Sequence, residues 1–292
     1  MASRYIGRFA PSPTGPLHFG SLVSALASYL DAKQHSGSWL VRIEDVDGTR
    51  CKSQYIEQIL TTLNSYQLLS DESPIKQSDF TQEYQDHLNL LKQQDQIFPC
   101  NCTRQSLQAY QGRHPHICQS NELSPHSWRL KSSNVIYRYH DAIQGELIFQ
   151  DDLKDNCPVL KRKDGYFSYQ LAVVVDDHRQ EISHLVRGAD LIETTAQQLH
   201  LYALLDWEAP KISHIPLVVN QAGNKISKQN HAKAIQDGDL STLLIALSYL
   251  GIEINASNIT EALNKAIPLW NKEILRGRST ITLADQHLHL IQ

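Results

Sequence analysis

Two loops, far apart in the sequence, carry residues suited to binding phosphate. The first follows a short apolar run and holds Gly15, Gly20 and a single histidine, His18. Glycines let a backbone approach a phosphate closely, and the N-terminus of a following helix attracts anions. The second loop places Lys225 and Lys228 three positions apart, and lysines suit phosphates that gain charge in a transition state. Either loop alone also fits a solvated turn, but together they indicate one phosphate site.

Cysteines in the middle of the chain have the spacing of a metal site. Cys100 and Cys102 stand one residue apart, and Cys118 follows sixteen positions later. Three thiolates from two short segments suit tetrahedral zinc, which needs one further nitrogen, sulfur or oxygen ligand. The candidates for that ligand are His114, His116 and Tyr110. The alternative is a group of buried free cysteines.

Alternating strand and helix patterns must position these loops. Residues 4–10 and 38–45 are predicted strands, and residues 22–33 and 53–63 repeat apolar side chains at helical spacing. Strands and helices that alternate in this way indicate βαβ units and a parallel sheet. Ligands of such sheets bind outside the carboxyl ends of the strands, where the first loop would lie.

The remaining elements are predicted from the same patterns. We expect a helix at 82–94, a small antiparallel insertion within 135–159, buried strands at 168–179, 182–191 and 210–219, and helices at 194–205, 240–250 and 259–266.

Composition excludes several classes of protein. Of the 292 residues 41% are hydrophobic and 20% charged, which argues against a disordered chain. The net charge of −4 means that any contacts with nucleic acid must be local. The sequence shows neither a secretory signal nor an apolar run of membrane-spanning length, so we expect a cytoplasmic protein with no membrane partner. An odd number of cysteines, five, argues against a disulfide framework.

Five ordered blocks between residues 8 and 229 match the signatures of one family. HFGS at 18–21 and KISKQ at 225–229 resemble its HIGH and KMSKS motifs. RFAPSPTG at 8–15, RIEDVD at 42–47, and YQLAVVVDD at 169–177 followed by LVRGADL at 185–191 are similar to further motifs of one branch. On these motifs the chain is identified as a member of the class I aminoacyl-tRNA synthetases, in their glutamyl and glutaminyl branch.

The resemblance implies an α/β architecture. It is a Rossmann-type parallel-sheet catalytic domain with a zinc-bearing α+β acceptor-binding insertion and a short C-terminal helical segment. The two halves of the catalytic domain would span residues 1–75 and 161–235. The insertion would span 76–160 and the helical segment 236–292.

The resemblance also implies the chemistry. ATP, with Mg²⁺, would activate L-glutamate; His18, Gly15 and Gly20 would hold ATP, and Lys228, with Lys225 behind it, would stabilise the leaving pyrophosphate. Arg8 and Arg187 would bind the side-chain carboxylate of glutamate, and Glu44 its ammonium group. The full set of implied glutamate-binding residues is Arg8, Phe9, Ala10, Pro11, Ser12, Glu44, Tyr169 and Arg187. The acids expected to position arginines and loops are Asp45, Asp47, Asp176 and Asp177.

The implied metal site departs from the family pattern at one residue. The family pattern is Cys-x-Cys followed by Tyr-x-x-x-Cys, and His114 stands where the tyrosine is expected, four residues before Cys118. Imidazole is a better zinc ligand than a neutral phenol. We therefore expect one structural zinc ion on Cys100, Cys102, His114 and Cys118, with His116 or Tyr110 as the alternative fourth ligand.

The acceptor is predicted from the length of the chain. Residues 229–292 are too few for the anticodon-binding domain of a standard glutamyl-tRNA synthetase. The chain thus resembles truncated members of the family that transfer glutamate to queuosine in the anticodon loop of tRNA(Asp), and we expect a monomer with that activity. Two alternatives remain: a minimal synthetase that charges the 3′ end of tRNA(Glu), and a non-catalytic tRNA-binding paralogue.

Overall fold

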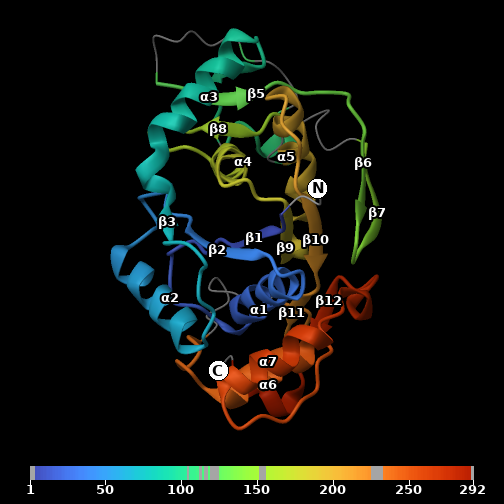
Figure 1. Cartoon of the computed structure of the whole chain (residues 1–292). Coiled ribbons are helices and arrows are strands. Elements are labelled where there is room, and N and C mark those ends of the chain that lie inside the picture. Colours follow the sequence, from blue (N-terminus) through green and yellow to red (C-terminus); the bar gives the residue numbers. More distant parts are fainter. Residues whose placement is uncertain are drawn as a thin grey trace.

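A parallel sheet forms the centre of the computed structural model, which describes residues 4–103, 105–111, 114, 118, 125–150, 156–224 and 233–290 (Figure 1). Two groups of parallel strands make up this sheet: β3-β2-β1 and β9-β10. The strands are β1 (Ile6–Phe9), β2 (Ser38–Ile43), β3 (Ile75–Lys76), β9 (His184–Gly188) and β10 (Lys211–Ile215). The two groups meet at β1, where Ser183 N, just before β9, donates to Ile6 O at 3.0 Å. The predicted parallel sheet is confirmed.

The larger hydrophobic core lies on one face of this sheet. α1 (Phe19–Gln34) follows the first loop and buries Leu22, Leu26 and Leu30 at helical spacing. α2 (Ser53–Ser65), α6 (Leu240–Tyr249) and α7 (Ile259–Leu269) add apolar side chains to the same core. α6 and α7 therefore hold the C-terminal part of the chain against α1 (Figure 1).

A second core joins three further helices to an antiparallel sheet. α3 (Thr81–Gln93), α4 (Tyr169–Arg179) and α5 (Ile192–Leu204) contribute buried residues to it. The sheet has the order β4-β5-β8, formed by Ile97–Cys100, Ser127–Leu130 and Val159–Lys161. A separate antiparallel hairpin pairs β6 (Tyr137–Asp141) with β7 (Gly145–Phe149), as predicted for this region.

Two predictions of secondary structure were wrong. Residues 169–179 form the helix α4 rather than a strand, because the apolar run is enclosed by α3, α5 and β8. Residues 210–219 form two strands, β10 and β11 (Leu217–Val219), separated at Pro216. Proline has no N–H for a sheet hydrogen bond, and after it β11 pairs with β12 (Thr280–Thr282) instead.

Short 3₁₀ turns complete the described structure. They span Gln77–Phe80, Gln108–Tyr110, Ala189–Leu191, Lys272–Leu275 and Asp285–Leu290. Within the described residues, none of the helices has the length and apolar character needed to span a membrane.

Candidate active site

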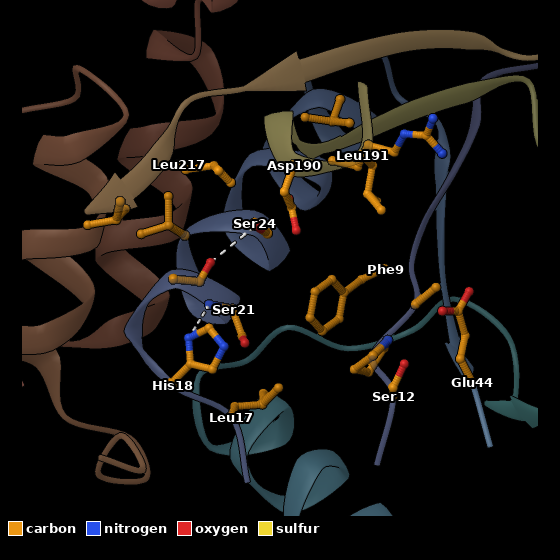
Figure 2. Close-up of a pocket in the computed structure, with 18 of the residues that line it drawn as sticks. Phe9, Ser12, Leu17, His18, Ser21, Ser24, Glu44, Asp190, Leu191 and Leu217 are labelled. Atoms are coloured by element: carbon orange, nitrogen blue, oxygen red, sulfur yellow. Dashed lines mark hydrogen bonds between the residues drawn. The ribbon is translucent and has the colours of Figure 1, made fainter. Parts of the chain in front are cut away.

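A cavity of about 570 Å³ opens at the carboxyl ends of β1, β2 and β9. In open α/β sheets this is the place where ligands bind, at the point where the strand order reverses. Here the order reverses between β1 and β9. Figure 2 shows Phe9 between two groups of polar side chains, with Glu44 and Ser12 on one side and His18 and Ser21 on the other.

Most of the residues predicted for the site line this cavity. They are Arg8, Phe9, Ala10, Pro11, Ser12, His18, Gly20, Glu44, Tyr169 and Arg187. Gly15 is not among the lining residues, and Lys225 and Lys228 lie outside the described residues. The polar lining residues that sequence reasoning missed are Thr14, Ser21, Ser24, Arg50 and Asp190. Thr14, Ser21 and Asp190 stand inside the motif blocks 8–15, 18–21 and 185–191, which could have singled them out. Ser24 and Arg50 lie outside those blocks, and position was their only signal.

The N-terminus of α1 forms one end of the cavity. His18 is the N-cap of this helix, and its Nδ1 accepts a hydrogen bond from Ser21 N at 3.3 Å (Figure 2). Because Nδ1 accepts, the proton of the neutral ring is on Nε2, which is therefore a donor. This end of the cavity combines that donor with the positive end of a helix dipole.

Glu44 follows β2 and is buried against the cavity. Burial raises the pKa of its carboxyl from 4.5 to about 7, although the Arg42 and Arg8 charges act to lower it. Its Oε1 lies 3.6 Å from Arg42 Nη2 and accepts no hydrogen bond from any described residue. A buried carboxylate oxygen without a donor is costly, so this position is suited to a ligand that brings a cationic donor.

Arg8 already has an acidic partner inside the protein. Its Nε and Nη2 donate to the two carboxylate oxygens of Asp177, each at 3.0 Å. Asp177 Oδ1 also accepts from Arg42 Nη2 at 2.7 Å, and Asp176 lies 3.6 Å from Arg42 Nε. The two acids, consecutive on α4, therefore position arginines of the site, the role that the sequence indicated for them.

The guanidinium of Arg187 is held only by neutral groups. Its Nε donates to His214 Nε2 at 3.1 Å, Nη1 to Gln198 Oε1 at 2.7 Å and Nη2 to Thr195 Oγ1 at 2.9 Å. No carboxylate of the described ranges forms an ion pair with it. Burial lowers the pKa of Arg187, yet an arginine stays charged in proteins. The side chain is thus a buried cation beside a cavity, suited to an anionic ligand.

Two acids of the RIEDVD block hold surface loops around the site. Asp45 accepts from Ser78 N at 2.8 Å and from its hydroxyl at 2.7 Å. Asp47 accepts from Arg50 Nε at 2.8 Å and Arg162 Nη1 at 2.9 Å. Desolvation acts to raise the pKa of Asp47, but these bonds and the one from Thr49 outweigh it and bring the pKa to about 2. The carboxylate therefore stays charged and keeps Arg50 at the rim of the cavity.

A separate cluster brings together Cys100, Cys102, His114 and Cys118. Their ligand atoms all lie within 4.8 Å of one another. His114 Nε2 is 3.2 Å from Cys100 Sγ and 3.3 Å from Cys118 Sγ, and the Cys102 and Cys118 sulfurs are 3.3 Å apart. Burial and the neighbouring thiols raise the pKa of Cys118 to about 12. Tyr110 is 47% exposed, and His116 lies outside the described part of the chain.

The donor set of this cluster fits zinc. Zinc–sulfur and zinc–nitrogen bonds of roughly 2.3 and 2.0 Å place tetrahedral ligand atoms somewhat under 4 Å apart, and the cluster is nearly that compact. A divalent cation would also deprotonate the thiols that otherwise crowd one another. The coarser prediction, a Cys₃His cluster, is present in the structure.

Comparisons with known proteins agree with this geometry. The family model for the catalytic domain of class I tRNA synthetases (E and Q) matches residues 6–254. A glutamyl-Q tRNA(Asp) synthetase from Serratia proteamaculans is 43% identical over 289 residues, covering 97% of this chain and 95% of the relative. One from Vibrio parahaemolyticus is 40% identical, covering 96% and 97%.

Solved structures share the fold at lower identity. A glutamate tRNA ligase from Elizabethkingia meningosepticum, crystallised with its amino acid, superposes with a TM-score of 0.79 at 22% identity. The match covers 97% of this chain and 68% of that one. A glutamate-tRNA synthetase from Elizabethkingia anophelis gives a TM-score of 0.81, also at 22% identity, covering 97% and 69%.

Proposed function

Since the chain belongs to the class I tRNA synthetases, within the group of glutamyl-Q tRNA(Asp) synthetases, we propose that it activates L-glutamate with ATP and transfers it to queuosine of tRNA(Asp). In the first step, the α-carboxylate of glutamate attacks the α-phosphate of ATP and pyrophosphate leaves. In the second, a hydroxyl of the queuosine cyclopentene ring attacks the carbonyl of the adenylate, loses its proton, and AMP leaves.

One observation carries the choice of substrate. Glu44 lacks a donor and Arg187 lacks an acidic partner among the described residues, and both line the same cavity. A zwitterionic amino acid with an acidic side chain satisfies both, because its ammonium group can donate to Glu44 while its side-chain carboxylate neutralises Arg187. Arg8 faces the same cavity with its charge offset by Asp177, so its part is to hold the substrate rather than to neutralise it.

The opposite end of the cavity suits the nucleotide. Gly20 and Ser21 lie in the first turn of α1, and Nε2 of His18 supplies a donor there. The apolar residues Leu17, Val23 and Val218 line the cavity too and suit an adenine ring. Lys225 and Lys228 would stabilise the pyrophosphate, and Mg²⁺ would offset its charge. Little covalent chemistry is asked of side chains, because positioning and charge stabilisation carry such a reaction.

We further propose that the Cys₃His cluster holds one structural zinc ion. Four protein ligands leave no open position for catalysis. Cys100 ends β4, whereas Cys102, His114 and Cys118 follow it in the long connection to β5. A metal ion would tie that connection to the sheet and so stabilise the acceptor-binding insertion proposed for residues 76–160.

The experiment that tests the function is transfer of radiolabelled glutamate to purified tRNA. Queuosine-containing tRNA(Asp) should accept glutamate, and the unmodified tRNA(Asp) transcript should not. Periodate, which cleaves vicinal diols, distinguishes the two sites of attachment when it is applied to the product after transfer. An ester on the queuosine ring protects that ring and leaves the 3′-terminal diol to be cleaved, whereas an ester at the 3′ end does the reverse. Labelling of tRNA(Glu) instead would favour a minimal synthetase, and no glutamate-dependent ATP–pyrophosphate exchange would contradict activation itself.

A further inference from the structure

A buried chain of side chains leads from the β6–β7 hairpin to Arg187. Asp141 ends β6 and His214 lies in β10, and both are fully buried. His214 Nδ1 lies 2.6 Å from Asp141 Oδ2, and its Nε2 accepts from Arg187 Nε at 3.1 Å. Neither the family motifs nor the sequence patterns singled out these two residues. We propose that Asp141 and His214 are positioning residues that set the glutamate specificity of Arg187, an inference that rests on the proposed function.

Asp141 determines which nitrogen of His214 carries the proton. Its carboxylate accepts from the backbone N–H groups of Ile143 at 2.8 Å and Gln144 at 2.9 Å, as well as from His214 N at 3.0 Å. With its oxygens accepting these bonds, the side chain is an ionised acceptor toward Nδ1. The proton of the imidazole is therefore on Nδ1, and the lone pair of Nε2 accepts from Arg187. The Thr195 hydroxyl also lies 3.3 Å from Nε2, but it donates to Leu191 O at 3.0 Å.

The neutral form of His214 matters for the charge of the pocket. Burial and the Arg187 charge lower the pKa of His214, against the opposing effects of Asp141 and Asp190. Arg187 thus receives an acceptor that brings no negative charge next to it, as it does from Gln198 and Thr195. A carboxylate in the place of His214 would offset the guanidinium charge internally. The neutral acceptor orients Arg187 while leaving its charge to be neutralised by the ligand.

This arrangement discriminates glutamate from glutamine. Three nitrogens of the guanidinium each donate one hydrogen bond, so Nη1 and Nη2 each keep one further N–H for a ligand. A carboxylate can accept both and neutralise the buried cation. A side-chain amide would leave the charge unpaired and turn its own N–H₂ group toward other donors, which costs binding free energy.

Two further hydrogen bonds fasten the hairpin to β10. Gln144 Nε2 donates to His214 O at 2.8 Å, and the Tyr139 hydroxyl donates to Ile212 O at 3.0 Å. β6 therefore packs on the edge strand of the parallel sheet, directly behind the substrate arginine. Amino-acid recognition consequently depends on a hairpin whose Asp141 precedes Arg187 by 46 positions in the sequence.

The test compares two substitutions of His214 that each keep half of its hydrogen bonding. His214→Gln can place an acceptor near the Nε2 position, whereas His214→Asn reaches only the Nδ1 position. In ATP–pyrophosphate exchange, His214→Asn should raise the KM for glutamate about 10- to 100-fold, with a smaller change in kcat, because a hydrogen bond to a charged group is lost. The increase in KM for glutamate should be several-fold smaller in His214→Gln than in His214→Asn. The ratio of kcat/KM for glutamate to that for glutamine should fall most in His214→Asn.

A matched control and a second readout complete the design. His140→Asn alters an exposed histidine of the same hairpin, which pairs with Glu146, and should leave KM unchanged. Nitrogen NMR of the ligand-free protein should find the His214 proton on Nδ1. Equal KM values for the two folded His214 variants, or a proton on Nε2, would overturn the inference. The tautomer is measured without substrate, so it tests the inference independently of activity. An unmodified protein without glutamate-dependent exchange would contradict the proposed function, not the inference.

Discussion

Replacing Glu44 with glutamine should weaken glutamate binding and, at the same time, stabilise the folded protein at alkaline pH. The substitution is nearly isosteric and removes one buried negative charge. Arg42 keeps its partners Asp177 at 2.7 Å and Gln180 at 2.8 Å, so the surrounding network remains held. Glutamate affinity should fall while stability rises. A purely structural role of Glu44 would instead lower stability, so the two roles are distinguishable.

The stability effect follows from the raised pKa of Glu44. A carboxyl group whose pKa rises from 4.5 to about 7 on folding holds its proton more tightly in the folded state. Stability of the unmodified protein therefore falls as the pH rises from 4.5 to 7, by an amount on the order of 3 kcal/mol for this one group. Glutamine has no such proton to lose, so Glu44→Gln should melt several degrees higher at pH 8 and show little difference near pH 4.

The binding effect follows from the loss of a charged acceptor. A hydrogen bond to an ionised group contributes about 1.5–3 kcal/mol, so the KM for glutamate should rise about 10- to 100-fold at pH 8. In the unmodified protein, glutamate binding should also weaken as the pH falls below 7, because a protonated Glu44 cannot pair with the ammonium group. That pH dependence should be absent in Glu44→Gln.

The measurements are glutamate-dependent ATP–pyrophosphate exchange and thermal melting, each at several pH values. Glu57→Gln, an exposed position on α2, is the matched control and should alter neither quantity. A Glu44→Gln protein that melts lower than the unmodified protein at pH 8, with an unchanged KM, would refute the assignment of a ligand-binding role.

Three further substitutions test other parts of the molecule. Lys228→Ala should lower the rate of adenylate formation about 10²- to 10³-fold while glutamate binding, measured by calorimetry, stays intact; equal loss of both would remove its proposed pyrophosphate role. His114→Ala should reduce the zinc content of the purified protein and its melting temperature, since the cluster would retain three thiols; an unchanged one-to-one zinc content would shift the fourth ligand to another residue. Gly188→Ala would place a methyl group 2.6 Å from Asp190 Oδ1 and 3.2 Å from Leu217 Cδ2, so the exchange rate should fall as Asp190 is displaced into the cavity, and a fully active variant would show that Asp190 moves elsewhere.

Several residues that line the cavity were predictable because they lie next to strand ends with strong local signals. β1 and β2 are short apolar strands, and the residues that follow them, from Ala10 to Ser12 and at Glu44, reach the cavity as a direct consequence of the parallel sheet. The run from Tyr169 to Arg179 was mistaken for a strand because a short apolar stretch has no period that separates a buried strand from a buried helix. Packing against α3 and α5 decided that stretch in favour of α4.

The sequence by itself determined the family, the parallel sheet and the residue types of the site, because each rests on contiguous motifs or local periodicity. Only the tertiary structure decided how the charges are paired. Arg8 and Arg187 are equivalent candidates in the sequence, yet Arg8 meets Asp177 while Arg187 meets His214 and other neutral groups. Such pairing depends on side chains brought within about 3 Å from distant positions, and local sequence patterns carry no information about those distances.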